Sequence, residues 1–125
     1  MNILLVDDSK TMRNIQKKIL EVNPGVQFHE AGDGLEALKV IATGIHIDLA
    51  LVDWNMPNMD GFTLVKKIRE TDRRTPIIMC TTEAEKPRII DALKAGVNNY
   101  VVKPFSGDVL LEKVEATLRK SREAA

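Results

Sequence analysis

The chain has 125 residues, of which 44% are hydrophobic, and its 18 basic and 18 acidic side chains balance to a net charge of zero. This length supplies the core of one ordinary domain, and the balanced charge excludes general electrostatic binding to nucleic acid or to a membrane surface. A single cysteine, Cys80, excludes an internal disulfide framework. No apolar run approaches the roughly 20 residues of a membrane span, and the N-terminus does not resemble a signal peptide, so we expect a cytoplasmic protein.

Short apolar runs alternate with helical patterns along the chain. The runs that predict strands are 3–6, 26–28, 49–52, 77–80 and 100–102. All but the second are nearly continuous, as expected for strands of a parallel sheet that is covered on both faces. Apolar residues at intervals near 3.6 predict a helix after each run. These residues are Met12, Ile15 and Ile19; Leu35, Leu38 and Ile41; Phe62, Val65 and Ile68; Ile89 and Leu93; Leu111, Val114 and Leu118.

Turn and cap residues separate the same elements. Asp33 precedes Gly34 at the start of the second helix, Gly96 follows the fourth, and Ser106 stands where it can cap the fifth. The pattern predicts five strand–helix units, that is, an α/β domain with helices on both faces of a parallel sheet. We expect one domain over residues 1–125 and no second, output domain.

Polar residues follow four of the predicted strands. Asp7 and Asp8 come after the first, Asp53 after the third, Thr81 and Thr82 after the fourth, and Lys103 after the fifth. Ligands of open α/β sheets bind at the carboxyl ends of the strands. A lone aspartate there is most often a turn or cap residue. Three acids, two hydroxyls and a lysine on four strand ends instead predict a functional site.

Three carboxylates in one place repel each other unless a cation joins them. A hard divalent ion with oxygen ligands fits best, and Mg²⁺ also leaves coordination positions for a phosphoryl group. The sulfur and imidazole alternatives are weak, because His29 and His46 lack the spacing of ligands and Cys80 lies inside an apolar run. We expect these three residues to be structural.

Four segments together resemble the receiver domain of two-component response regulators. They are LLVDDS, VDWNMPNMDG, the TT after the fourth strand, and YVVKPF. The resemblance spans the whole chain, and DWNMPNMDG and AGVNNYVVKPF are especially similar to the CheY-type, single-domain chemotaxis regulators. It implies a flavodoxin-like fold with the strand order 2-1-3-4-5.

The resemblance also implies a role for each site residue. Asp53 aligns with the phosphoacceptor, Asp8 with the direct Mg²⁺ ligand, Asp7 with the ligand that acts through water, and Asn55 with the residue whose carbonyl completes the metal site. Thr81 and Lys103 align with the catalytic residues that contact the phosphoryl group, and Thr81 and Tyr100 with the switch residues. The Lys103–Pro104 bond is cis in the family. Thr82 replaces a residue that is often small, and Asn55 and Glu83 flank the expected path of the hydrolytic water.

The implied activity is transfer of a phosphoryl group from a CheA-like histidine kinase to Asp53, followed by a change in the face formed by the fourth helix, fifth strand and fifth helix. In chemotaxis regulators this face binds a FliM-like flagellar motor switch protein. The corresponding residues here are Lys86, Ile89, Tyr100 and Lys113. A phosphatase is a further partner that the resemblance allows, and we expect a monomer that binds neither nucleic acid nor membrane.

Two other functions stay open beside motor control. One is a stand-alone receiver in a phosphorelay unrelated to motility, or a phosphate sink. The other is an aspartate-nucleophile phosphatase, which places a second aspartate two residues after the nucleophile as a proton donor. Here that position holds Asn55, whose amide cannot donate a proton in this way. The residue types therefore favour a long-lived phosphoryl-aspartate over enzymatic turnover.

Overall fold

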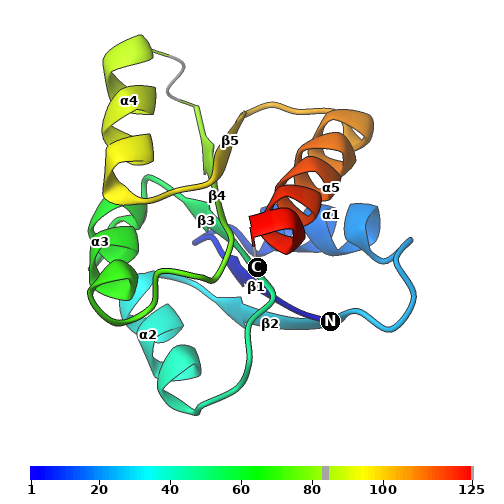
Figure 1. The fold of residues 1–125 in the computed structure, drawn as a ribbon, viewed down its shortest axis with the longest axis horizontal. Helices are drawn as coiled ribbons and strands as arrows, with labels where there is room; N and C mark the ends of the chain where they lie inside the picture. Colours follow the sequence, from blue (N-terminus) through cyan, green and yellow to red (C-terminus); the bar gives the residue numbers. More distant parts are fainter. Residues whose placement is uncertain (83–84, 125) are drawn as a thin grey trace.

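Five strands and five helices alternate along the residues that the computed structural model describes, 1–82 and 85–124 (Figure 1). The strands are β1 (Asn2–Val6), β2 (Gln27–Ala31), β3 (Leu49–Asp53), β4 (Ile77–Thr81) and β5 (Asn99–Val102). The helices are α1 (Lys10–Leu20), α2 (Gly34–Ala42), α3 (Gly61–Thr71), α4 (Lys86–Ala95) and α5 (Gly107–Ala124). None of the described helices is both long and apolar enough to span a membrane.

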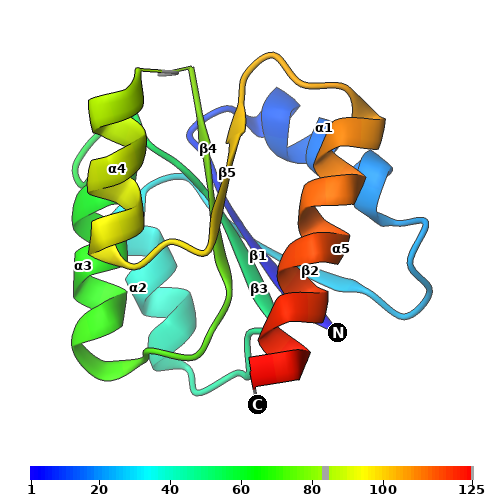
Figure 2. The same cartoon turned by 45° about the horizontal axis from the view of Figure 1, so that its top comes forward.

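The strands form one parallel sheet in the order β2-β1-β3-β4-β5, which confirms the order that the receiver resemblance implies. Helices α1 and α5 cover one face of this sheet, and α2, α3 and α4 cover the other (Figure 2). The chain moves outward from β1 to β2 and then returns to place β3 on the other side of β1. The strand order therefore reverses between β1 and β3, where ligands of such sheets bind.

The core has two halves, one on each face of the sheet. Alternate residues of a strand point to opposite faces, so Leu4 and Val6 pack on the side of α2, α3 and α4, whereas Ile3 and Leu5 pack on the side of α1 and α5. Leu64 of α3 and Leu110 of α5 are fully buried members of the two halves. Burial on both faces explains why β1, β3 and β4 are almost entirely apolar.

Strand β2 differs from its prediction. It begins at Gln27 and continues through His29 and Glu30 to Ala31, rather than covering 26–28. As an edge strand it is only partly covered, so polar residues can take part in it. Glu30 forms two ion pairs with α1. Its Oε1 lies 2.9 Å from Arg13 Nε, and its Oε2 lies 3.0 Å from Lys17 Nζ. These contacts stabilise β2, whose bounds cannot be predicted from its few apolar residues.

The apolar pattern predicts the helices but misplaces some of their side chains. Ile15, expected on the buried face of α1, is 44% exposed, and the buried residues of that helix are Gln16 and Leu20. Leu35 and Leu93 are also exposed. The buried residues of those two helices are Gly34 and Ala37 on α2 and Ala92 on α4.

The predicted caps are present. Asp33 Oδ1 accepts a hydrogen bond from Glu36 N at the start of α2, and Ser106 Oγ accepts one from Val109 N at the start of α5. Gly96 ends α4 with a φ of 115°, a conformation that glycine adopts without strain.

Candidate functional site

The polar residues predicted at the strand ends lie together at one edge of the sheet. Asp7 and Asp8 follow β1, Asp53 ends β3, Thr81 ends β4, and Lys103 follows β5. The strands are parallel, and the register pairs Val6 with Val52, so the acids after β1 reach the same level as Asp53. The carboxyl edge thus gathers side chains that are up to 96 positions apart in the sequence.

Three carboxylates and one ammonium form the centre of this edge. One oxygen from each of Asp7, Asp8 and Asp53 lies within 4.8 Å of the other two. Lys103 Nζ lies 2.9 Å from Asp7 Oδ2 and 3.2 Å from Asp53 Oδ1. One lysine therefore neutralises part of the charge of two acids. Its position is fixed by the sheet, because Lys103 N donates to Thr81 O at 2.8 Å.

The two adjacent aspartates have different surroundings. Asp7 is only 1% exposed, and its Oδ1 accepts a hydrogen bond from Ser9 N at 2.9 Å. Asp8 is exposed, and within the described chain it has no hydrogen-bond or ion-pair partner. Ser9 caps α1 by accepting from Met12 N, which starts the helix directly after the acids. The turn therefore ties Asp7 to the protein and leaves the Asp8 carboxylate available to a ligand.

The electrostatic environment of the site disfavours the charged form of Asp53 and favours the charged form of Lys103. Burial raises the pKa of Asp53, and the charges of Asp7 and Asp8 add to this, against the lowering effect of Lys103. Burial would lower the pKa of Lys103, but its hydrogen bond to Asp7 and the charge of Asp53 outweigh burial and raise that pKa. The lysine therefore stays charged, while Asp53 carries a negative charge that its surroundings only partly compensate.

These residues fit a bound divalent cation. The cluster offers three carboxylates and one compensating ammonium, so it has excess negative charge. That excess contributes to the raised pKa of Asp53, because the charges of Asp7 and Asp8 both disfavour its ionised form. Carboxylate oxygens are the ligands that hard divalent ions prefer. A cation here would relieve the repulsion without displacing the ion pairs of Lys103.

Comparisons with known proteins agree with this geometry. Residues 3–115 match the response regulator receiver domain. The chain belongs to this family. It is a CheY-like receiver, a signalling phosphoacceptor: the chemotaxis protein CheY1 of Helicobacter pylori is 48% identical over 120 residues, which cover 94% of this chain and 97% of that protein.

Solved receiver structures share the fold. A CheY-like receiver domain protein from Methanospirillum hungatei superposes with a TM-score of 0.89 at 31% identity, covering 99% of this receiver and 98% of that chain. The crystal structure of a CheX-CheY-BeF3-Mg²⁺ complex from Borrelia burgdorferi matches with a TM-score of 0.86 at 30% identity, covering 93% and 87% of the two chains.

The loop after β3 positions Asp53 through Gly61, a residue whose role is not apparent from the sequence. Gly61 N donates to Trp54 O at 2.8 Å. A Cβ atom on Gly61 would lie 2.1 Å from the carbonyl oxygen of Asp53, so only glycine fits against this backbone. The indication in the sequence is the Asp60–Gly61 pair at the start of α3, which reads equally well as an ordinary cap. Asn55, in the same loop, is exposed.

The predicted switch residues lie on β4 and β5. Thr81 is 2% exposed, and its backbone pairs with Val102, whereas Tyr100 pairs with Met79. Tyr100 is half-buried and packs against the core half that contains α4. The Lys103–Pro104 bond is cis, as the resemblance implies.

The four residues of the predicted partner face are only partly brought together. Lys113 of α5 places its Nζ 4.9 Å from the centre of the Tyr100 ring. Lys86 and Ile89 lie about one turn apart on α4, the first exposed and the second half-buried. The face thus combines residues of α4, β5 and α5.

The three residues expected to be structural, Cys80, His29 and His46, have different environments. Cys80 is fully buried, and burial raises the pKa of its thiol to about 12. His29 Nε2 contacts Asn2 Oδ1 at 3.2 Å, and His46 Nε2 lies 3.3 Å from Asp48 Oδ1. Thr82 is exposed, and Glu83 lies outside the described residues.

Proposed function

We propose that this receiver takes a phosphoryl group from the phosphohistidine of a CheA-like kinase onto Asp53 and signals through its α4-β5-α5 face to the flagellar motor. The observation that carries the proposal is the position of the Asp53 carboxylate between a charged lysine and two further acids. The names of the chemotaxis relatives support the motor as the output. We assign this function to a single receiver domain over residues 1–125, acting in the cytoplasm as a monomer.

The transfer step follows from the residue types. Oδ1 of Asp53 is paired with Lys103, so we assign the attack to Oδ2. This oxygen forms a bond to phosphorus as the bond from phosphorus to the histidine nitrogen breaks, and the imidazole leaves with the electron pair of that bond. Lys103 neutralises charge on the phosphoryl oxygens, and the Thr81 hydroxyl donates a hydrogen bond to one of them. The product is an acyl phosphate. A small phosphodonor in place of the kinase would give autophosphorylation.

Mg²⁺ is the ion that we assign to the acidic cluster. When bound, it neutralises the repulsion between the carboxylates and the incoming phosphoryl group. Asp8 and Asp53 would be direct ligands, Asp7 would act through water because Lys103 and Ser9 already occupy its oxygens, and the Asn55 carbonyl would complete the set. The Borrelia complex of CheX and CheY, which contains Mg²⁺ and BeF3, supports this choice of ion.

Phosphorylation by acetyl phosphate tests the acceptor. The wild-type protein should gain one phosphoryl group in the presence of Mg²⁺, detected by intact-protein mass spectrometry, and Asp53→Asn should gain none. Asp60→Asn is the matched control, because Asp60 lies in the same loop and caps α3, and asparagine caps equally well. Phosphorylation of Asp53→Asn, or its loss in Asp60→Asn, would contradict the assignment.

The output depends on movement of two side chains. A phosphoryl group adds roughly 1.5 to 2 negative charges, which can draw the Thr81 hydroxyl toward it. The space that Thr81 leaves would let Tyr100 turn further into the core, with a changed surface around Lys86, Ile89 and Lys113. A mixed basic and apolar surface of this kind suits an amphipathic acidic segment.

Binding of a FliM N-terminal peptide separates motor control from the other receiver functions. The phosphorylated protein should bind the peptide at least about tenfold more tightly than the unphosphorylated protein, which corresponds to about 1.4 kcal/mol. Thr81→Ala should accept the phosphoryl group and lose most of this difference. Normal phosphorylation with no peptide binding would instead indicate a phosphate sink or a non-motility phosphorelay, and rapid release of inorganic phosphate would indicate a phosphatase.

A further inference from the structure

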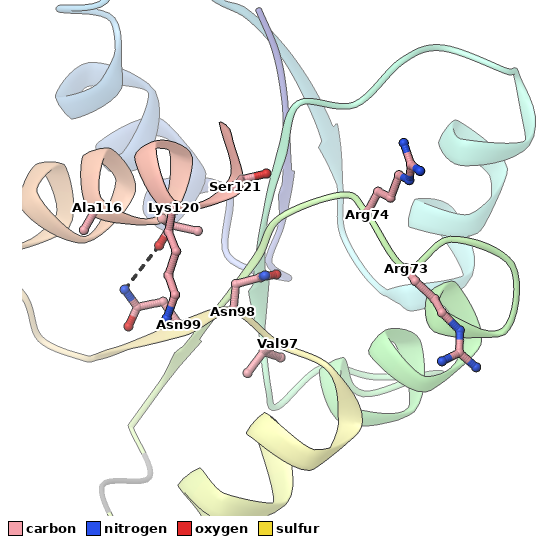
Figure 3. A pocket seen from close by; sticks show the side chains of 9 residues that line it. Arg73, Arg74, Val97, Asn98, Asn99, Ala116, Lys120 and Ser121 are labelled. Carbon is pink, nitrogen blue, oxygen red and sulfur yellow. Dashed lines mark hydrogen bonds between the residues drawn. The ribbon is translucent and has the colours of Figure 1, made fainter. Parts of the chain in front are cut away.

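Figure 3 shows a basic cavity. It lies at the opposite end of the sheet from the acidic cluster, because its residues precede β4 and begin β5 whereas the acids follow β1 and end β3. Its volume is about 880 Å³, within the range of roughly 300–1,000 Å³ that small-molecule sites occupy. It is bounded by the segment that enters β4, the start of β5, and the last turns of α5. Three cations line it: Arg73 and Arg74 before β4, and Lys120 on α5.

The charge of this basic cavity is positive without local compensation. None of the described residues that line it is acidic. Asp72, which precedes Arg73, is not among them, and its oxygens accept hydrogen bonds from the backbone of Arg74 and from Thr75 inside the loop. The two basic residues beside it therefore have charge to offer to an external anion.

One wall of the basic cavity is held rigidly. Asn98 Oδ1 accepts hydrogen bonds from Ile77 N at 2.8 Å and from Arg69 Nη2 at 3.1 Å. Because both bonds use the oxygen, the amide group of Asn98 is left to donate to a ligand. Asn99 is fixed by its bond to Thr117 Oγ1, at 3.2 Å, which is the dashed line in Figure 3. Neutral donors in fixed positions are typical of sites for anions.

The cations stand on two sides of the cavity. Lys120 extends from α5 toward Asn99, while Arg73 and Arg74 lie on the opposite side, with their guanidinium groups directed away from each other and from Asn98 (Figure 3). A smaller cavity of about 270 Å³ shares Arg74 and Ser121 with the first and is lined also by Arg122 and by the carboxylate of Asp48. The separation of the three cations of the basic cavity suits a ligand that carries several charges along its length rather than one. No aromatic side chain lines the basic cavity among the described residues, so it offers no stacking surface for a nucleobase.

We propose that the basic cavity binds a small oligophosphate anion through Arg73, Arg74 and Lys120. Guanidinium groups match phosphate oxygens in geometry and remain charged at all physiological pH values. The ligand would be recognised by linked phosphate groups, whether they belong to a free oligophosphate or to the phosphate chain of a nucleotide. Binding here does not require phosphorylation of Asp53.

Calorimetric titration of the full, unphosphorylated chain with tripolyphosphate tests the proposal. EDTA is included so that phosphate groups cannot bind through a divalent ion at the acidic cluster. The triple variant Arg73→Gln, Arg74→Gln and Lys120→Gln removes the cations. All three side chains are exposed, so the fold should be retained, which circular dichroism checks. The matched control removes the same number of charges elsewhere, as Lys18→Gln, Lys39→Gln and Lys67→Gln, all exposed on other helices.

We expect saturable binding to the wild type, an affinity about thirtyfold lower in the triple variant, and a change of less than about threefold in the control. Equal affinity for tripolyphosphate and ATP would identify a free oligophosphate as sufficient, and tighter binding of ATP would identify a nucleotide; both support the proposal. Absence of binding, or an equal loss in the control variant, would overturn it. Binding of adenosine alone, or tighter binding of an acidic peptide through the same three residues, would overturn the assigned ligand class.

Discussion

The guanidinium group of Arg88 lies over the indole ring of Trp54, with 4.8 Å between the guanidinium carbon and the ring centre. Arg88 belongs to α4, and Trp54 directly follows Asp53. The same indole stacks on Phe62 of α3, at 5.4 Å between ring centres and 11° between planes. A helix of the proposed output face is thus in direct contact with the residue next to the proposed phosphoacceptor.

Mg²⁺ binding should therefore change the fluorescence of Trp54. Trp54 is the only tryptophan, and it is buried beside the acidic cluster, so a new charge there alters its surroundings. We expect a saturable change in emission at millimolar Mg²⁺, reversed by EDTA. Asp8→Ala should require at least about tenfold more Mg²⁺, because it removes an exposed carboxylate without disturbing the ion pair of Asp7. An identical titration of wild type and Asp8→Ala would remove the case for this metal site.

Asp53→Asn should stabilise the protein in the absence of divalent ions. The raised pKa of Asp53 means that ionisation costs stability: this contribution is present below the ordinary pKa of aspartate and is lost as pH rises through the raised value. Asparagine avoids that loss, so at neutral pH the midpoint of thermal unfolding should rise by about 3 °C. The difference should vanish well below the ordinary pKa of aspartate, where the wild-type group is protonated in both states. A lower midpoint for Asp53→Asn at neutral pH would show that the ion pair with Lys103 dominates instead.

Affinity for Mg²⁺ should fall as the pH is lowered, starting above the ordinary pKa of aspartate. Protons compete with the metal for Asp53, whose pKa is raised chiefly by burial. Fluorescence titrations of Trp54 over a pH series measure this, and Asp53→Asn should show both weaker binding and a smaller dependence on pH. The same pH dependence in the two proteins would assign the proton to another group.

Gly61→Ala should reduce both stability and phosphorylation. The added Cβ would meet the carbonyl oxygen of Asp53 at 2.1 Å, and a backbone atom in a buried strand cannot move aside cheaply. We expect a loss of about 2 kcal/mol in the free energy of unfolding by urea, and slower labelling by acetyl phosphate. Gly107→Ala is the control: its nearest contact would be 3.5 Å from Ile19 Cγ1, and alanine should be neutral or stabilising there. Equal effects of the two substitutions would rule out a steric role for Gly61.

Arg69→Ala should be strongly destabilising although the residue is only half-buried. Its guanidinium donates to four acceptors, which join the end of α3 to the segments before β4 and β5. They are the carbonyl oxygens of Gly96, Asp72 and Thr75 and the side chain of Asn98. We expect a loss of about 3 kcal/mol in urea unfolding. Arg69→Lys should recover less than half of this, because an ammonium cannot reproduce the planar fork, and the exposed Arg73→Ala should change stability by less than about 0.5 kcal/mol.

The sequence is informative where one physical rule dominates. Continuous apolar runs identify β1, β3 and β4 because both faces of these strands are buried, and parallel strands must then bring Asp7, Asp53 and Lys103 to one edge. The rule weakens at the edge of the sheet, where β2 depends on the ion pairs of Glu30 with α1. These ion pairs join different elements of the fold, so the pattern of apolar residues within β2 carries no information about them.

Residues that act through distant contacts are not apparent from the sequence. In the sequence, Gly61 resembles an ordinary helix start, and only the structure shows how close it lies to the backbone of Asp53. Arg69 resembles a solvated arginine, whereas in the structure it donates to Gly96 O. The buried side of α1 is misassigned because Gln16 occupies a position that an apolar residue would be expected to fill. In each case the deciding contact is made with a residue outside the helix whose pattern was analysed.

The basic cavity and the acidic cluster occupy opposite ends of the same strands, in a protein whose net charge is zero. Such a molecule has a dipole moment along the sheet even though it has no overall attraction to an ion. Near a positively charged partner it should turn its carboxyl edge forward before contact is made, so that more encounters begin with Asp53 facing the partner. Added salt should slow this orientation, and with it the rate of productive encounters, more than it weakens the final complex.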